Sequence, residues 1–311
     1  MCRRLTAYVE CNNILSPTQF GFRAGKSTDD AINEFLNDAY CSLDRSEYFA
    51  AVCLDLSKAF DTVNHDILLR KLHHLGLRGI TYNWFRSYLS DRVSYVSVSK
   101  VNSTTRTTQI GVPQGSNLGP LLFLLYVNDM RSSTEGLKLI NFADDTTVYM
   151  SNSNIDTLYV RLSDELARIG QWLQVNRLSL NIDKTNYMIV TNRKFISRAV
   201  QLSGKNVKIA DHIFFLGVYV DKSLSFKKHA QNLVKKVSSA IGMIRRVSNL
   251  MPVNVRLKIY YALIYSRISY AVTIWGRTLA SNISLCNSAL KRAWKVVFFC
   301  HKGRSFPVKK C

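Results

Sequence analysis

Residues 137–149 read LKLINFADDTTVY, and this stretch decides the fold. Two β-favouring runs flank Asp144 and Asp145, which predicts two strands of a hairpin with both acids at its turn. Adjacent aspartates are common at turns because Asp tolerates turn geometry. Taken alone, the pair is therefore better explained as a turn former than as a functional site.

A third carboxylate lies in a similar setting further upstream. The apolar run from Phe49 to Leu54 predicts a buried strand that ends at Asp55. A strand end and a neighbouring hairpin tip bring Asp55, Asp144 and Asp145 within a few ångströms of one another. Such a cluster repels itself unless divalent cations neutralise it. The pattern therefore predicts a site for two Mg²⁺ ions about 3.5–4 Å apart, with Mn²⁺ as an alternative.

The remaining periodicity places these strands in a sheet. Between Phe49 and Val190 the predicted order is strand, helices, hairpin, helix and strand, a split βαββαβ arrangement with helices on one face of an α+β sheet. The predicted helices are residues 28–43, Leu68–Leu75 closed by Gly76, Ile80–Leu89, Ser116 or Asn117 to about Met130, and Ile155–Leu173. The other predicted elements are a hairpin of residues 92–98 and 104–110, and strands at 185–191 and about 213–220.

The charge is unevenly distributed along the 311 residues. Residues 191–311 contain 23 Lys and Arg against only two acids, whereas residues 1–190 contain 19 of each sign, so the whole net charge of +21 falls in the last two-fifths. A solvated basic face explains a few such residues but not this imbalance. The pattern favours binding to a polyanion, most simply the backbone of a nucleic acid.

The seven cysteines are scattered and form no CxxC pair, which favours neither a zinc site nor a disulfide framework. Cys300-His301, close to Cys311, has too few ligands to predict a zinc module. No signal peptide or membrane-spanning stretch is recognised, so we expect an intracellular protein of the cytoplasm, the nucleus or both.

Five stretches occur in a specific order: AAVCLDLSKAFDTV (50–63), GVPQGSNLGPLLFLLYVNDM (111–130), NFADDTTVY (141–149), WLQVNRLSLNIDKT (172–185) and FFLGVYVD (214–221). In order and spacing they resemble the motifs of reverse transcriptases from non-LTR (LINE-like) retrotransposons, of the jockey and chicken-repeat type. The upstream NNILSPTQFGFRAGKSTDDAI (12–32) resembles the lead-in of the same family. The resemblance extends from about Arg4 to Gly276.

The resemblance implies an α+β right-hand polymerase with a ferredoxin-like palm, partial fingers and a helical basic thumb. Family members begin the polymerase some tens of residues earlier, with finger strands, so we expect the fingers to be truncated. The implied domains are truncated fingers at 1–47, a palm at 48–61 and 112–222, an insertion at 62–111, and a thumb with an unassigned tail at 223–311.

The resemblance also assigns roles to matching residues. Asp55 and Asp144 would bind both metal ions with support from Asp145, and Lys184 would protonate the departing pyrophosphate. An exposed loop lysine would look the same in sequence. Phe60 would exclude a sugar 2′-hydroxyl, although core packing explains it too. Gln114 and Gly115 would contact the incoming nucleotide, and Phe215, Leu216 and Gly217 would form the primer grip. The thumb would bind duplex phosphates through Lys227, Lys228, Lys235, Lys236, Arg245 and Arg246.

The implied function is RNA-directed DNA polymerisation, with transfer of a nucleotide from a dNTP to a primer 3′-OH. The implied partners are an RNA template with its DNA primer, and dNTPs, with no membrane. The rival hypothesis is a catalytically inactive remnant that only binds nucleic acid. The oligomeric state is left open.

Overall fold

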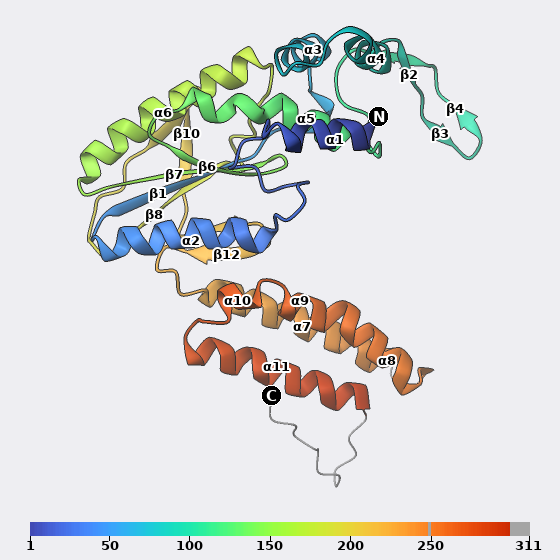
Figure 1. Ribbon diagram of the computed structural model, residues 1–311. Coiled ribbons are helices and arrows are strands. Elements are labelled where there is room, and N and C mark those ends of the chain that lie inside the picture. Colours follow the sequence, from blue (N-terminus) through green and yellow to red (C-terminus); the bar gives the residue numbers. More distant parts are fainter. Residues whose placement is uncertain (248–249, 299–311) are drawn as a thin grey trace. The chain divides into compact units, whose positions relative to one another are not determined.

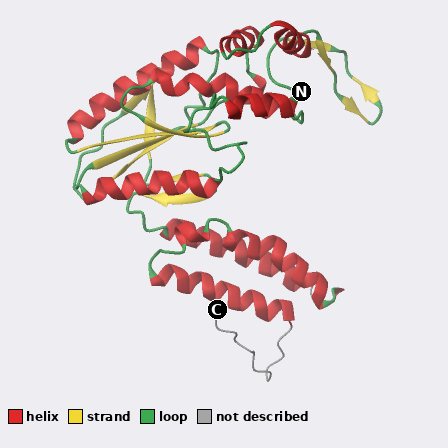
Figure 2. Cartoon of the chain, in the orientation of Figure 1, coloured by secondary structure: helices red, strands yellow, loops and turns green. Residues whose placement is uncertain are grey.

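The computed structural model describes residues 1–247 and 250–298 (Figure 1). They fall into two compact units, Met1–Asp211 and the described residues from His212 onward. Each unit is described by itself. The first contains a central sheet covered by helices (Figure 2). Its helices are α1 (Cys2–Cys11), α2 (Thr28–Asp44), α3 (His65–His74), α4 (Gly79–Leu89), α5 (Gly119–Val127) and α6 (Ile155–Val175), with short 3-10 turns η1 (Ala59–Asp61) and η2 (Asn128–Ser133).

The strands of the first unit form one six-stranded sheet and an outlying hairpin. The sheet order is β6-β7-β1-β8-β10-β9, with β1 antiparallel to both β7 and β8. The sheet strands are β1 (Tyr48–Leu54), β6 (Lys138–Phe142), β7 (Asp145–Asn152), β8 (Asn186–Val190), β9 (Val200–Leu202) and β10 (Lys205–Ile209). The order of β1, β6, β7 and β8 is that of a split βαββαβ sheet, and the α+β class is confirmed.

The expectation that helices cover only one face of the sheet is wrong. Helices α5 and α6 cover one face and α2 covers the other (Figure 1). Phe35 of α2 makes edge-to-face contacts with Phe49 and Tyr149, at 5.4 Å between ring centroids in each case. Because β1 is a central strand with both faces buried, its sequence is continuously apolar and does not alternate. The continuous apolar run from Phe49 to Leu54 was therefore a signal that both faces of the sheet are covered.

Local capping explains where two of the predicted helices begin. Ser27 caps α2 in a capping box with Asp30, and Asn154 caps α6 by accepting hydrogen bonds from the amides of Asp156 and Thr157. The predicted hairpin at 92–110 is present but shorter in its strands. It consists of β2 (Arg92–Ser94) paired with β5 (Arg106–Thr108), and β3 (Ser97–Val98) paired with β4 (Val101–Asn102).

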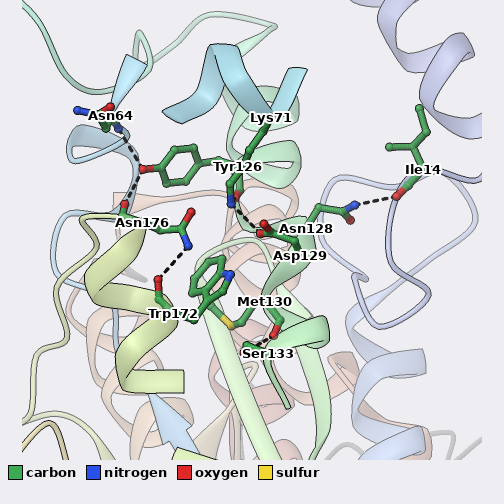
Figure 3. A network of polar contacts seen from close by, with 10 residues as sticks. All are labelled: Ile14, Asn64, Lys71, Tyr126, Asn128, Asp129, Met130, Ser133, Trp172 and Asn176. Carbon is green, nitrogen blue, oxygen red and sulfur yellow. Dashed lines mark hydrogen bonds and ion pairs between the residues drawn. The ribbon is translucent and has the colours of Figure 1, made fainter. Parts of the chain in front are cut away.

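A polar network, buried around the Tyr126 hydroxyl, ties α3, α5 and α6 together (Figure 3). The Tyr126 hydroxyl accepts a hydrogen bond from the Asn64 amide and donates one to the carbonyl of Asn176. The Lys71 ammonium donates to the Tyr126 carbonyl and to Asp129, at 2.6 Å each. Burial lowers the pKa of Lys71, and the Asp129 carboxylate opposes that effect. The network satisfies polar groups that packing would otherwise leave unpaired.

The second unit is a hairpin followed by helices. Its elements are β11 (His212–Phe215), β12 (Val218–Asp221), α7 (Lys227–Val247), α8 (Val253–Tyr260), the π-helical turn η4 (Tyr261–Tyr265), α9 (Ser266–Ser269), α10 (Val272–Trp275) and α11 (Ala280–Phe298). The single strand predicted at about 213–220 is a hairpin, because Leu216 and Gly217 adopt positive φ between its two halves.

The stretch after Arg277, which has no assigned motif, contains helix α11. Its Ala289, Ala293 and Val297 are fully buried and pack with Val237 and Ile244 of α7. The four-residue spacing of these small residues places them on one helical face, so α11 belongs to the core of this unit. Cys300, His301 and Cys311 lie outside the described residues. Within the described part of the chain, no helix has the length and apolar character needed to cross a bilayer.

Candidate active site

The three candidate carboxylates lie at one edge of the central sheet. Asp55 follows β1 directly, and Asp145 opens β7 immediately after Asp144. In the register of the two strands Leu54 pairs with Thr146, so the next positions on each strand are Asp55 and Asp145. Partial burial raises the pKa of Asp145, and the negative charges of Asp144 and Asp55 raise it further. The structure therefore brings the three acids within electrostatic reach of one another.

The loop after α6 holds the backbone around Asp55. The Asn181 amide donates a 2.8 Å hydrogen bond to the carbonyl of Asp55, and the Asp55 amide donates to the hydroxyl of Thr185 at 3.3 Å. Thr185 is fully buried. The same loop places the Lys184 ammonium 3.9 Å from Asp55 Oδ2, with 70% of the lysine side chain exposed. An exposed ion pair of this kind stabilises the fold little, but it places an amine beside the acids.

A segment from the N-terminal region clamps the turn that carries Asp144 and Asp145. Residues 18–21, called the Gln19 clamp below, lie along β6 as a short parallel strand. The Phe20 amide donates to the carbonyl of Asn141 at 2.8 Å, and the Asn141 amide donates to that of Thr18 at 2.9 Å. The side chain of Gln19 is buried, and its oxygen accepts hydrogen bonds from the amides of Gly21 and Ala143.

Ala143 forms the turn that directly precedes Asp144 and Asp145. It has a φ of 58°, which is unfavourable for a residue with a Cβ, and it is 7% exposed. Gly21 lies against it, since a Cβ on Gly21 would come 2.4 Å from the Ala143 nitrogen. Sequence reasoning missed Gln19 as a site residue. The glycine two positions later, in a stretch resembling the family lead-in, was the available signal.

A second group of candidate residues lies after β1. Phe60 is partly buried and stacks on Phe123 of α5 with centroids 4.5 Å apart, so it does pack against the core. Its carbonyl accepts a 2.8 Å hydrogen bond from the Val112 amide. The Gln114 amide group donates to Asp61 at 2.6 Å, which ties the Gln114 loop to the Phe60 turn. Gly115 has a φ of 79° and open space where a Cβ would stand.

The donors of the acid cluster are carboxylate oxygens, the ligands that Mg²⁺ prefers. Burial raises the pKa of Asp145 most, and the charges of Asp144 and Asp55 add to it; a bound cation would relieve that repulsion. The donor chemistry therefore fits a divalent ion. In residues 1–247 and 250–298, however, no three His, Cys, Asp or Glu side chains are already gathered as metal ligands.

The candidate primer grip lies in the second unit, at the turn of the β11–β12 hairpin. Phe215 is buried, and Leu216 and Gly217 have φ values of 43° and 86°. The hydroxyl of Tyr270 donates a 2.6 Å hydrogen bond to the carbonyl of Leu216. A Cβ on Gly217 would come 2.8 Å from the Tyr270 ring. Tyr270 therefore supports the turn, and only a glycine at position 217 lets the Tyr270 ring approach the backbone so closely.

Helix α7 presents a basic face, defined here as the exposed residues Lys227, Lys228, Lys235, Lys236, Arg245 and Arg246. At 100° per residue, these six positions fall within one half of the helical circumference. The opposite half carries the buried residues Ala230, Leu233, Val237, Ala240 and Ile244. The helix is thus amphipathic, with its apolar side in the core and its charges in solvent.

Known proteins match this chain along most of its length. Residues 1–220 match the family model described as reverse transcriptase (RNA-dependent DNA polymerase). The chain is 26% identical to the RNA-directed DNA polymerase from mobile element jockey of Drosophila melanogaster, over 90% of this chain and 32% of that protein. It is 29% identical to the probable RNA-directed DNA polymerase from transposon X-element of the same species, over 96% of this chain and 33% of that protein. The chain spans about a third of the length of these relatives.

Solved structures share the fold. A telomerase from Candida albicans, solved with the TWJ fragment of telomeric RNA, matches with a TM-score of 0.54 and 15% identity, over 96% of this chain and 54% of that one. A telomerase from Candida tropicalis, solved with the same fragment, matches with a TM-score of 0.52 and 13% identity, over 96% and 56%. At such low identity these matches show the fold alone.

The resemblance drawn from the five ordered motifs is confirmed by these relatives, which are non-LTR elements. The family model covers both the acid cluster and the loop of Gln114 and Gly115. The chain belongs to the reverse transcriptase family, among the LINE-like enzymes of non-LTR retrotransposons.

Proposed function

We propose that this chain is an RNA-directed DNA polymerase, which extends a primer 3′-OH with deoxynucleotides by copying an RNA template. The observation that carries the proposal is the meeting of Asp55, Asp144 and Asp145 at one end of the paired strands β1 and β7. Burial raises the pKa of Asp145 there, and the charges of Asp144 and Asp55 raise it further. Carboxylates that repel one another cost stability in a folded protein. Their presence in a member of this family is explained if they serve the reaction.

Reverse transcriptases use divalent metal ions, and Asp55 and Asp144, supported by Asp145, would hold two Mg²⁺ ions or Mn²⁺ in their place. Bound there, the metal would activate the primer hydroxyl and neutralise charge on the leaving pyrophosphate. The chain's own contribution is to hold the carboxylates in position. The Gln19 clamp fixes the turn of Asp144, and the amide of Asn181 fixes the backbone of Asp55.

Lys184 would donate a proton to the departing pyrophosphate. Its ammonium lies 3.9 Å from Asp55, so it is within reach of the site while its side chain remains exposed and able to move. Phe60 would form an apolar wall beside the sugar's 2′ position, and its stacking on Phe123 would keep that wall rigid. Gln114 and Gly115 would contact the incoming dNTP, with the open space at Gly115 allowing close backbone approach.

The subdomains of a right-hand polymerase follow from these roles. The palm would comprise residues 48–61 and 112–222, with finger residues at 1–47, an insertion at 62–111 and the thumb from 223 onward. The turn of Phe215, Leu216 and Gly217 would position the primer end, supported by Tyr270. The basic face of α7 would bind phosphates of the template–primer duplex without regard to sequence.

Primer extension tests the proposal. Poly(rA) annealed to oligo(dT) is incubated with dTTP, Mg²⁺ and the chain, beside Asp144→Asn and Asp164→Asn. Asp164 is an exposed carboxylate of α6 away from the acid cluster, so its substitution is a matched control. Extension by the wild type and the control, lost in Asp144→Asn, supports the proposal. Duplex binding without extension under both Mg²⁺ and Mn²⁺ would reject it in favour of a catalytically silent, nucleic-acid-binding remnant.

A further inference from the structure

A cavity of about 710 Å³ in the first unit lies apart from the acid cluster. Its walls come from α3 with the residue before it, from α4 with the residues after it, from β5 of the outlying hairpin with the residues after it, and from Arg177, two positions after α6. None of Asp55, Asp144, Asp145, Gln114 and Gly115 lines it. Its volume is in the range of sites that hold a ligand larger than a single inorganic ion.

Three arginines give the cavity a positive charge. Arg70, Arg86 and Arg177 reach it from α3, α4 and the end of α6, and all three are exposed. The ion pairs of the described part of the chain include none of them. His65 also lines the cavity, and the acids there are Asp66 and Asp91. Guanidinium groups outside ion pairs are suited to bidentate contacts with phosphate oxygens.

The lining also supplies hydroxyl groups. Thr107, Thr108 and Ser90 line the cavity and can donate hydrogen bonds to the same oxygens. Between Asp91 and Asp129 the sequence contains no acid, while Arg92, Lys100 and Arg106 lie on the outlying hairpin. The positive potential therefore continues from the cavity along this hairpin.

Aromatic rings lie on the same helix that forms one wall. Trp84 and Tyr88 of α4 are stacked with ring planes 9° apart and centroids 5.3 Å apart, and Trp84 is 38% exposed. The guanidinium of Arg92 lies 5.4 Å from the Tyr88 ring. Stacked rings with a neighbouring arginine are the platform on which unpaired bases stack. An acidic peptide would use the arginines but not this platform.

The cavity wall runs directly into the loop of Gln114 and Gly115. Ile110 and Asn64 form a bridge at the cavity, the Gly111 amide donates a 2.7 Å hydrogen bond to the carbonyl of Val63, and the carbonyl of Gly111 bonds the His65 ring. A strand bound in the cavity would therefore be anchored next to the loop that we assign to the incoming nucleotide.

We propose that this cavity binds the phosphodiester backbone of a single-stranded nucleic acid, and that bases of the strand beyond the cavity stack on Trp84 and Tyr88, which do not line it. The inference rests on the proposed polymerase function, in which the bound strand is template that has not yet been copied. It adds a site for the unpaired strand, separate from the α7 face that would bind duplex.

Fluorescence anisotropy with labelled oligo(U) and with oligo(dT) of equal length tests the cavity without any need for catalysis. The test variant changes Arg70, Arg86 and Arg177 to Gln. A matched control changes Arg3, Arg4 and Arg161, which are exposed and do not line the cavity, so both variants lose three charges. A third variant with Lys at the three cavity positions keeps the charge but loses the bidentate geometry.

Three lost phosphate contacts should flatten the slope of log affinity against log salt by about 2 for a single strand. We expect that change in the Gln variant, less than half of it in the control, and an intermediate loss of affinity in the Lys variant. Equal slopes in the Gln variant and the control would overturn the proposal. A preference for oligo(U) identifies RNA as the ligand, whereas a preference for oligo(dT) overturns the template assignment.

Primer extension with the same three variants separates this proposal from the polymerase function. Wild-type extension with unchanged oligo(U) binding in the Gln variant rejects the cavity and leaves the polymerase standing. Cavity-dependent binding without extension by the wild type rejects the polymerase and with it the template role. Circular dichroism confirms that each variant is folded before either comparison is made.

Discussion

Replacing Gly21 with alanine should move the turn that carries the candidate metal ligands. The added Cβ would stand 2.4 Å from the nitrogen of Ala143 and 2.9 Å from the carbonyl carbon of Phe142, whereas ordinary contact begins near 3.4 Å. Both neighbours are backbone atoms, so no side chain can swing away. The Gln19 clamp and the turn must therefore separate by about 1 Å.

The magnitude follows from two costs. Overpacking of this kind costs about 1–3 kcal/mol. The separation also weakens the hydrogen bonds of the Phe20 amide to Asn141 and of the Ala143 amide to Gln19, each worth about 0.5–1.5 kcal/mol. We expect the free energy of unfolding of the first unit to fall by about 2–4 kcal/mol, which lowers the urea midpoint by about 1 M.

Catalysis should fall further than stability alone explains. A displacement of about 1 Å at the reacting centre costs about a hundredfold in rate. We expect kcat for primer extension to fall by that order, with a smaller change in KM for dTTP, because the loop of Gln114 and Gly115 is tied to Asp61 and not to the moved turn.

Gly242→Ala is the matched control, since it places the same methyl group in open space on helix α7. Alanine is also the better helix former, so this variant should be as stable as the wild type or more so. If Gly21→Ala matched the wild type in both urea midpoint and kcat, the clamp would not abut the turn. A loss of stability with unchanged kcat would show that the Gln19 clamp packs against the turn but does not position the carboxylates for catalysis.

Four further outcomes follow from the site. Asp144→Asn should abolish extension while duplex affinity, measured by anisotropy, changes by less than twofold. A parallel loss of binding would contradict the assignment of duplex binding to residues other than the acid cluster. Changing the four lysines of the α7 basic face to Gln should flatten the salt slope of duplex binding by about 3–4, and an unchanged slope would exclude the thumb assignment. The pKa of Asp145 is raised in the folded state, so above that folded-state pKa its charged carboxylate destabilises the fold. The free energy of unfolding should therefore rise as pH falls from above the folded-state pKa toward 3.8. Asp145→Asn should remove this trend in urea midpoints. Burial lowers the pKa of His229 from 6.5 to about 4, so the second unit should lose up to about 3 kcal/mol as pH falls from 6.5 to 4, and His229→Asn should flatten that loss in urea titrations.

The predicted elements with strong local signals are confirmed by the structure. Helices α2, α3, α4 and α6 and strands β1, β6 and β7 lie within a few residues of their predicted bounds. Periodicity and caps such as Ser27 and Asn154 are written in neighbouring residues, which is why they can be read without the fold. Helix α1 and strands β9 and β10 were not predicted.

Sequence alone also predicted which residues would carry the chemistry of this family, and it determined where the charge lies along the chain. Asp55, Asp144 and Asp145 occur in ordered motifs, and the basic excess is confined to the last two-fifths of the chain. Both are properties of residue type and order. They do not depend on knowing which segments meet in space.

Only the tertiary structure decided which distant residues support that chemistry. Gln19 reaches Ala143 across 124 positions of the chain, and Tyr270 reaches Leu216 across 54. Arg70, Arg86 and Arg177 line one cavity although 107 positions separate the first from the last. Hydrogen bonds and packing between such residues leave no periodic trace in a single sequence, because a buried glutamine or an exposed arginine has the same identity whatever it contacts.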